Sequence, residues 1–383
     1  MTADVLPPLT DRDGPLTELV APHADVLNAD LAELDAGGVF SRAKWQAIRD
    51  SGILRTPFKE EHGGSGRSFT ETMKALEGLG YHCRDAGIAF STSTQIVSLA
   101  TPLEKFGSAE LKARYLPRIL SGEAITAHAI TEESGGSDAM NISTVAVRED
   151  DHYVVDGGKM FITNAPVADL FLLYVRTGKP GPFGLTCLLV ERDTPGLEIG
   201  EPLDKLGLRT SPLGRLSFDR LRVPVTNRVG AEGGGFLVLD YVMKREILYA
   251  FSLSLGEMRH RLDTVIRFAT ERSQFGRPIS GYQAISHKIV DMRIAVETAA
   301  KWLADTGAKA ERGEDISLDL ASTKIVVSEA NVKTALDAVQ IHGGRGVLTS
   351  YGIERDLRNS VAGTIYSGSS EIQRNRMAAL LGL

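Results

Sequence analysis

The chain has 383 residues, 43% of them hydrophobic and 24% charged, a composition typical of a globular protein with two or three domains. A net charge of −6, with eight acids against one arginine in residues 1–37, argues against a nucleic acid partner. The N-terminus lacks a secretory signal and no apolar run is long enough to span a bilayer, so we expect a cytoplasmic protein without membrane insertion.

The number and spacing of the cysteines argue against a disulfide-stabilised protein and against a zinc protein. Cys83 and Cys187 are the two cysteines, and neither has His or Cys neighbours at metal-ligand spacing. The pattern argues against a disulfide framework and against a structural zinc site. We therefore expect two free thiols and no metal.

Residues 1–123 show helical periodicity divided by Gly, Pro and Ser, which predicts an N-terminal helical domain. The stretch Asp85–Leu99 is nearly uncharged, which favours a helix that is buried on most faces and lines a ligand cavity. The expected helices of this domain lie at 16–35, 41–51, 68–81, 87–100 and 108–119.

Residues 124–233 change to short β-prone runs separated by turn signals, which predicts a small, barrel-like middle β domain. Long helical patterns then return, so residues 234–383 are predicted to form a C-terminal helical bundle. The expected strands lie at 142–147, 153–155, 170–175, 185–190 and 215–223, and the expected helices at 236–272, 282–312, 317–340 and 353–382. The predicted fold is mainly α with a central β domain.

Two segments near the β domain have the chemistry of a ligand site. The loop Thr131–Asp138 combines hydroxyls, including Ser137, with two glycines that permit close backbone approach to a ligand, although alone it is more typical of a polar surface loop. Phe161 and Thr163 are two residues apart in a strand pattern, hence on one face, where they could pack on a flat ring and hydrogen-bond its edge. A core Phe beside a solvated Thr is an equal alternative.

Three later segments lie at helix ends. Arg272 could clamp a pyrophosphate through its planar guanidinium, although an Arg facing the helix dipole is the commoner reason for this position. The segments Gln340–Gly346 and Tyr366–Arg374 each join glycines to a helix end, and the second places Ser369 and Glu371 at a helix start, where free N–H groups favour anions or capping oxygens.

In this order, the segments resemble the acyl-CoA dehydrogenase family from end to end of the chain. That family typically shows TEP-x-x-GSD, W-I-T-N, K-L-G-x-R-x-S, R-x-x-F-G, Q-x-x-G-G-x-G and Y-x-G-T-S-x-I-Q-R. The matching residues here are Thr131-Glu132, Gly136-Ser137-Asp138, Phe161-Ile162-Thr163-Asn164, Lys205-Leu206-Gly207-Leu208-Arg209-Thr210-Ser211, Arg272, Phe275, Gly276, Gln340, Gly343, Gly344, Gly346, Tyr366, Gly368, Ser370, Ile372, Gln373 and Arg374.

The resemblance implies an FAD cofactor and a set of residues that hold it. Thr131 and Thr163 would touch the flavin ring, Phe161 would pack on it, and Ser137 would lie near the pyrophosphate. The residues implied to hold the ADP half of a neighbouring subunit's cofactor are Arg272, Phe275, Gln340, Gly343 and Gly344, and those implied to lie against the cofactor from the tail are Ser369 and Glu371. The resemblance therefore also implies a homo-oligomer, commonly a homotetramer.

The reaction of this family needs a carboxylate that takes the α-proton of a thioester while the β-hydrogen leaves as hydride to flavin N5. Many relatives supply a Glu from the tail, where this chain has Ser367, whose hydroxyl cannot replace a carboxylate base. Branches resembling isovaleryl-CoA dehydrogenase place the Glu on the first long C-terminal helix, which corresponds here to Glu246. Its helical neighbours include no cation, so burial is expected to raise its pKa. Ser367, Tyr366 and Tyr249 are the expected substrate contacts.

The expected function is FAD-dependent α,β-dehydrogenation of a short or branched acyl thioester, carried by CoA or an acyl carrier protein, with an electron-transfer flavoprotein or similar acceptor. Four positions depart from the usual family residues: Glu133 replaces Pro, Phe161 replaces Trp, Ser367 replaces Glu and Ile247 replaces Arg. The last two change the active-site wall. A flavin-dependent monooxygenase and a non-catalytic binding subunit therefore stand as alternatives.

Overall fold

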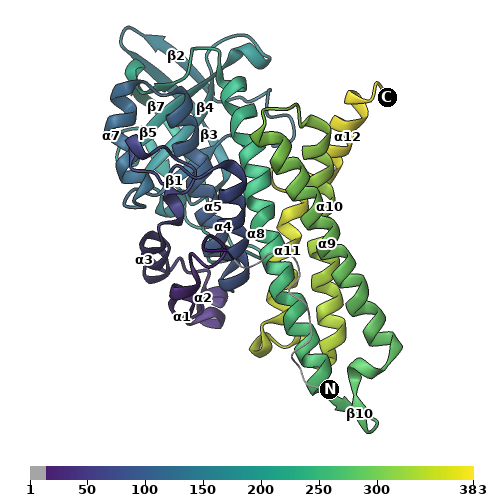
Figure 1. The fold of residues 1–383 in the computed structure, drawn as a ribbon. Coiled ribbons are helices and arrows are strands. Elements are labelled where there is room, and N and C mark those ends of the chain that lie inside the picture. Colours follow the sequence, from purple (N-terminus) through teal and green to yellow (C-terminus); the bar gives the residue numbers. More distant parts are fainter. Residues whose placement is uncertain (1–13) are drawn as a thin grey trace.

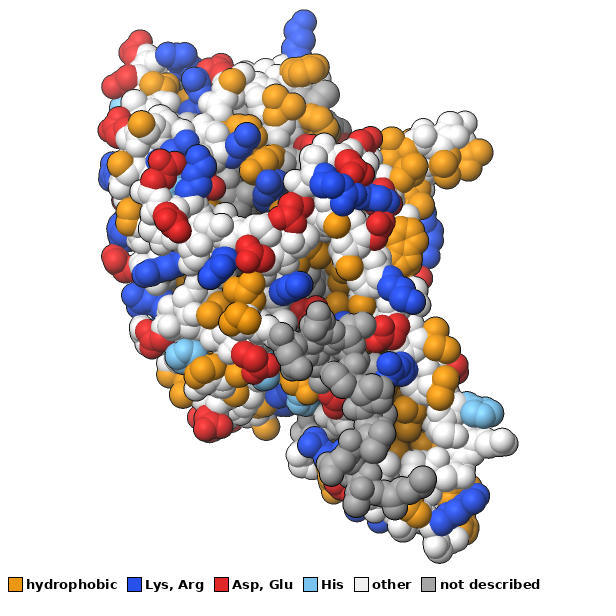
Figure 2. Space-filling view, in the orientation of Figure 1, with side chains coloured by type: hydrophobic (Ala, Val, Ile, Leu, Met, Phe, Trp, Pro, Cys, Tyr) orange, Lys and Arg blue, Asp and Glu red, His pale blue; other side chains and the backbone are white. Residues whose placement is uncertain are grey.

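The computed structural model describes residues 14–383 and has the expected order of a helical region, a β-sheet and a bundle of long helices (Figure 1). The predicted fold class is confirmed. The domain boundaries remain predictions, and residues 1–13 of the acidic N-terminal stretch lie outside the described part. On the face shown in Figure 2, acidic and basic side chains are interspersed, without a broad patch of one sign. Within residues 14–383, no helix has the length and apolar character needed to cross a membrane.

The N-terminal helices begin where capping side chains satisfy free backbone N–H groups. Ser68 accepts from the N–H of Glu71 and the Glu71 carboxylate accepts from that of Ser68, a reciprocal capping box, while Asp85 caps the next helix. The helices are α1 (Ala24–Leu27), α2 (Leu31–Gly37), α3 (Arg42–Ser51), α4 (Phe69–His82), α5 (Ala86–Gln95), α6 (Thr101–Phe106) and α7 (Ala109–Leu120).

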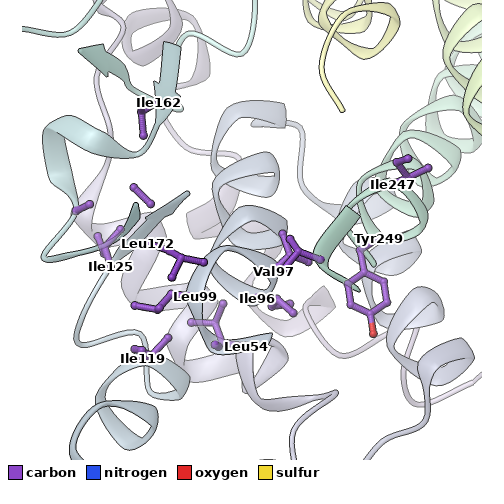
Figure 3. Close-up of a cluster of buried hydrophobic side chains, with 14 of the residues drawn as sticks. Leu54, Ile96, Val97, Leu99, Ile119, Ile125, Ile162, Leu172, Ile247 and Tyr249 are labelled. Atoms are coloured by element: carbon purple, nitrogen blue, oxygen red, sulfur yellow. The ribbon is translucent and has the colours of Figure 1, made fainter. Parts of the chain in front are cut away.

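Two predicted N-terminal helices differ from the structure. The helix expected over 16–35 is wrong as one element, because a short 3₁₀ turn, α1 and part of α2 replace it, with Asp30 in the left-handed region. The helix expected over 87–100 changes from α to a π-helical turn at Ile96–Ala100 and then continues into α6. Its predicted burial is confirmed, and its Ile96, Val97 and Leu99 lie in one apolar cluster with Leu172 (Figure 3).

The middle region forms an eight-stranded sheet in the order β6-β7-β3-β2-β4-β5-β8, with β1 pairing in parallel with β4. Strands β4 and β5 are buried along almost their whole length, as their continuous apolar runs require. The strands are β1 (Thr126–Ala129), β2 (Val145–Glu149), β3 (His152–Thr163), β4 (Leu170–Arg176), β5 (Leu185–Glu191), β6 (Leu197–Ile199), β7 (Leu213–Pro224) and β8 (Arg228–Val229). The sequence did not predict β1, β6 or β8, which are too short to show a period.

The C-terminal bundle packs directly against the N-terminal helices. A Cβ at Gly80 of α4 would lie 2.1 Å from the Leu253 carbonyl oxygen, and one at Gly256 would lie 2.0 Å from that of Glu77, so glycine permits the close crossing of α4 and α8. The helices are α8 (Gly235–Glu271), α9 (Gln283–Glu311), α10 (Ser317–His342), α11 (Ile353–Val361) and α12 (Ser370–Leu380), and a hairpin of β9 (Ser273–Gln274) and β10 (Arg277–Pro278) joins α8 to α9.

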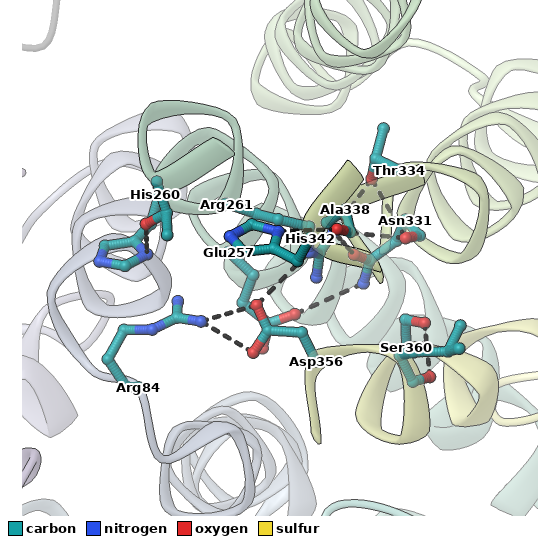
Figure 4. Close-up of polar contacts among 12 residues, drawn as sticks. Arg84, Glu257, His260, Arg261, Asn331, Thr334, Ala338, His342, Asp356 and Ser360 are labelled. Atoms are coloured by element: carbon teal, nitrogen blue, oxygen red, sulfur yellow. Dashed lines mark hydrogen bonds and ion pairs between the residues drawn. The ribbon is translucent and has the colours of Figure 1, made fainter. Parts of the chain in front are cut away.

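The single helix expected over 353–382 is wrong, because a turn with positive φ at Ser367 and Gly368 separates α11 from α12. Near α11, a buried polar cluster joins three parts of the chain (Figure 4). Arg84, between α4 and α5, donates from its Nη2 to both carboxylate oxygens of Asp356 on α11, and Arg261 of α8 lies 3.4 Å from the same carboxylate. Both arginines lower the pKa of Asp356 against the opposing effect of burial.

Candidate active site

Glu246 and Ser367 meet although 121 residues separate them in the sequence. Glu246 projects from the first part of α8, and its side chain is 24% exposed. Ser367 lies in the turn before α12 with φ at 55°, an uncommon conformation for a residue with a side chain. Its hydroxyl donates a 2.5 Å hydrogen bond to Glu246 Oε1. The strained turn thus places a donor on the carboxylate predicted to be the base.

The structure adds His128, which the sequence reasoning missed. His128 lies on β1, and its Nδ1 is 3.8 Å from Glu246 Oε2, with the His128 side chain 10% exposed. The expectation of a raised pKa for Glu246 is wrong. Burial does raise that pKa, but His128 and the Ser367 hydroxyl outweigh it and leave the pKa below its ordinary value. Helical spacing could not show this, because both residues come from other elements.

Aromatic rings form one wall beside these residues. The Tyr366 ring lies 4.8 Å from that of Phe90 and 5.6 Å from that of Phe251, measured between centroids. A small pocket next to this wall is lined by residues of α5, α8, α10 and α11, including Phe90, Ala250 and Glu257. Tyr249, in contrast, is 1% exposed and packs on Phe69 of α4, so it lies in the core (Figure 3). Its role as a substrate contact remains a prediction.

A buried carboxylate holds the loop that contains Thr131 and Ser137. Glu132 accepts hydrogen bonds from the backbone N–H and hydroxyl of both Ser143 and Thr144, and from Lys159 at 2.8 Å. These donors outweigh burial and lower the pKa of Glu132 to about 2. Thr131 is partly buried and Ser137 is exposed, so the loop is fixed at its base and its far side is open to solvent.

Phe161 and Thr163 lie at the end of β3, where the strand is irregular. The pairing of β3 with β7 shifts register between Lys159 and Ile162, and Phe161 has φ at 59°. The regular alternation that would put both side chains on one face is therefore interrupted at Phe161. The bulge holds the Phe161 ring 55% exposed, which suits packing against a flat ligand.

The start of α12 contributes polar groups close to Ser367. Ser369 caps the helix by accepting a hydrogen bond from the N–H of Ile372, and Glu371 is exposed in the first turn. Ser370 Oγ and Gln373 Oε1 are buried and have no hydrogen-bond partner within residues 14–383. Buried polar atoms normally have partners, so these two atoms fit a site completed by a bound polar group.

The remaining predicted cofactor residues lie at the other end of α8, beside the β9–β10 hairpin (Figure 1). Arg272 is exposed, and its guanidinium pairs with no carboxylate in the described part of the chain. Phe275 has φ at 50° and is 94% exposed. Gln340 is also exposed at the end of α10, and a Cβ at Gly343 or Gly344 would meet no atom within 4 Å. These residues form a second group that is open to a ligand.

One chain does not bring the two groups together. Glu246 lies on the unbroken helix α8 and Arg272 directly follows its last residue, Glu271, so their separation of 26 residues corresponds to about 39 Å along the helix axis. Each group has an exposed aromatic ring on a residue with left-handed backbone, Phe161 in the first and Phe275 in the second. The first group adds hydroxyl side chains, and the second adds Arg272 and glycines with open space around them. This composition fits a long cofactor with flat rings and phosphates, bound partly by one chain and partly by another.

Comparison with known proteins gives matches over nearly the whole chain. Family models match the acyl-CoA dehydrogenase N-terminal domain at 19–123, the middle domain at 127–221 and the C-terminal domain at 233–382. An L-prolyl-[peptidyl-carrier protein] dehydrogenase of Pseudomonas fluorescens is 38% identical over 90% of this chain and 91% of its own length.

Solved structures agree with this likeness. PigA with FAD and proline superposes with a TM-score of 0.93 at 32% identity, covering 100% of both chains. Butyryl-CoA dehydrogenase from Megasphaera elsdenii superposes with a TM-score of 0.92 at 29% identity, also covering 100% of both chains.

Proposed function

Because the chain belongs to the acyl-CoA dehydrogenase family, we propose that Glu246 is the base with which this FAD-dependent acyl thioester dehydrogenase takes the α-proton of its substrate. The chemistry that FAD supplies when bound is acceptance of the β-hydrogen as hydride. One observation carries the proposal: Glu246 is a largely buried carboxylate that Ser367 holds in place from the tail position where many relatives have their base. A carboxylate with a lowered pKa is ionised at neutral pH and ready to accept a proton.

Two sets of residues would hold FAD. The set near Glu246 comprises Thr131, Ser137, Phe161, Thr163, Ser369 and Glu371, and the set at the far end of α8 comprises Arg272, Phe275, Gln340, Gly343 and Gly344. The span of about 39 Å along α8 from Glu246 to Arg272 supports a cofactor shared between subunits, in which the second set of one chain would hold part of the FAD of another. A homo-oligomer, in this proposal a homotetramer, would complete each site.

The substrate in this proposal is a short acyl group on a carrier protein, with L-prolyl as the leading candidate. The wall of Tyr366, Phe90 and Phe251 limits the space beside Glu246 and thereby favours a compact acyl group. The likeness to the L-prolyl-[peptidyl-carrier protein] dehydrogenase supports this group and this carrier. A CoA thioester is the alternative carrier, and an electron-transfer flavoprotein or similar protein in the cytoplasm would accept the electrons.

The test is anaerobic reduction of the bound flavin, followed by its absorbance, with L-prolyl-loaded carrier protein and butyryl-CoA as the two probes. Glu246→Gln keeps size and hydrogen-bonding capacity but removes the base, so the limiting rate should fall by at least about 100-fold with whichever probe reduces the wild-type flavin. The matched control is Asp240→Asn, because Asp240 lies on the same helix in an ion pair with Lys244 and should be replaceable without loss. A wild-type rate in Glu246→Gln would refute the assignment, and reduction by butyryl-CoA alone would refute the prolyl substrate.

A further inference from the structure

His128 is the titratable residue of the short strand β1, whose other residues are a threonine and two alanines. In β1, residues Thr126, Ala127 and Ala129 are buried, whereas the ring of His128 reaches Glu246 on α8. The distance from Nδ1 to Oε2 is 3.8 Å, which is too long for a hydrogen bond but close enough for the ring to interact with the charge of the carboxylate. The contact is therefore electrostatic in the described geometry, and a small rotation of either side chain would convert it into a hydrogen bond.

The two oxygens of Glu246 have different partners. Ser367, which follows Glu246 in the chain, donates to Oε1. His128, which precedes Glu246 and lies on β1, faces Oε2. Ser367 belongs to a turn with unusual φ and His128 to a sheet strand, so the two partners come from elements other than α8. A carboxylate contacted at both oxygens by groups on separate elements has a defined orientation.

Packing alone does not explain a histidine at position 128. Its ring lies edge-on to Tyr174 of β4, with centroids 4.9 Å apart, a contact that a phenyl ring would make equally well. Within residues 14–383, His128 Nε2 is buried without a hydrogen-bond partner. An imidazole thus carries the cost of an unpaired buried nitrogen, which a purely structural role would avoid. The compensating feature is Nδ1 beside Glu246.

We propose that His128 is a positioning residue of the catalytic base: its Nδ1 and the Ser367 hydroxyl together orient the Glu246 carboxylate and keep it ready to accept the α-proton. This rests on the proposed role of Glu246. The titratable groups that face the His128 ring are Glu246 from α8 and Tyr174 from β4, with Cys187 of β5 behind Tyr174. Of these, Glu246 is the group whose charge the ring can stabilise at neutral pH.

His128→Phe tests the proposal, because it keeps a ring edge-on to Tyr174 but removes Nδ1. Without His128, burial dominates and the pKa of Glu246 should rise, so the base is protonated at a higher pH. The limiting rate of anaerobic flavin reduction should fall at least about tenfold at pH 6 and approach the wild-type rate at pH 9. Half-saturation by the active probe and FAD content should stay unchanged, since the ring touches the base rather than the rest of the site.

Two further variants separate this role from a structural one. His128→Gln retains a neutral donor for the carboxylate and should recover part of the rate at pH 6. Tyr174→Phe removes the hydroxyl behind the ring and should keep the wild-type pH profile. In parallel, the infrared band of the protonated Glu246 carboxyl, identified by its loss in Glu246→Gln, should appear at a higher pH in His128→Phe.

The outcomes distinguish the two proposals. A wild-type pH profile in His128→Phe, or equal rates for His128→Phe and His128→Gln at every pH, overturns the positioning role while leaving Glu246 as the base. A wild-type rate in Glu246→Gln overturns the base assignment itself. If His128→Phe fails to fold, His128→Gln decides the matter: an unshifted acid limb together with an unshifted carboxyl band overturns the proposal, and a shift supports it.

Discussion

Lys159→Met is expected to destabilise the protein through the Glu132 carboxylate, which holds the loop Thr131–Asp138. Lys159 and Glu132 form a 2.8 Å ion pair, with side chains 0% and 4% exposed. The lowering of the Glu132 pKa from 4.5 to about 2 corresponds to about 3 kcal/mol. Burial lowers the pKa of Lys159 from 10.5 to about 8, a cost of similar size, so the pair as a whole contributes close to zero. Removing Lys159 alone leaves the Glu132 charge with only its Ser143 and Thr144 donors, which should cost about 3 kcal/mol.

The measurement is urea unfolding with saturating FAD, followed by flavin fluorescence and circular dichroism. The double variant Glu132→Gln/Lys159→Met removes both charges but keeps an oxygen for the Ser143 and Thr144 donors, so it should be more stable than Lys159→Met. Because the folded pKa of Glu132 is depressed, its stabilisation is complete above pH 4.5 and is lost as the pH falls toward 2. Glu132→Gln should lack this acid-side loss. A Lys159→Met protein within about 1 kcal/mol of wild type would refute the reasoning.

Other features give three shorter predictions. Arg84→Met should destabilise the protein by about 3 kcal/mol in urea unfolding, since the buried Asp356 would keep only its longer contact with Arg261. Cys83 and Cys187 are buried, and burial raises the pKa of Cys83 to about 12, so neither thiol should react with a thiol reagent until denaturant is added. Phe161→Ala should weaken FAD binding about tenfold in equilibrium titrations, whereas Phe161→Trp should retain it.

The long elements could be predicted from the sequence because each carries its own period. The patterns at 236–272 and 282–312 lie within two residues of α8 and α9 at both ends, and the apolar runs at 170–175 and 185–190 match β4 and β5. The predicted helix over 353–382 failed, because the local pattern continues through a turn that tertiary contacts impose at Ser367. Short β1 showed no period at all, and a parallel partner 44 residues away determines its position.

In the candidate site too, features carried by local motifs could be predicted, whereas features set by contacts between distant residues could not. Family motifs predicted Glu246 as the base and a set of flavin-binding residues, and the structure places the residues of this predicted set in two separate regions of one chain. The charge state of Glu246 could not be predicted, because the groups that set it, His128 and Ser367, are more than 100 residues away in the sequence. Glu132 matched a motif position, but its anchoring function became visible only once Lys159 and Thr144 were placed around it.

Helix α8 also restricts how this chain can change during evolution. Glu246 lies on α8 and Arg272 directly follows its last residue, Glu271, so deleting a single residue between them would rotate everything beyond it by about 100° and shift it by about 1.5 Å. Such a deletion would turn the far group of cofactor residues away from its ligand while leaving the base in place. Insertions and deletions in related sequences are therefore expected in surface turns such as 178–184. The number of residues between Glu246 and Arg272, 25 in this chain, should stay constant.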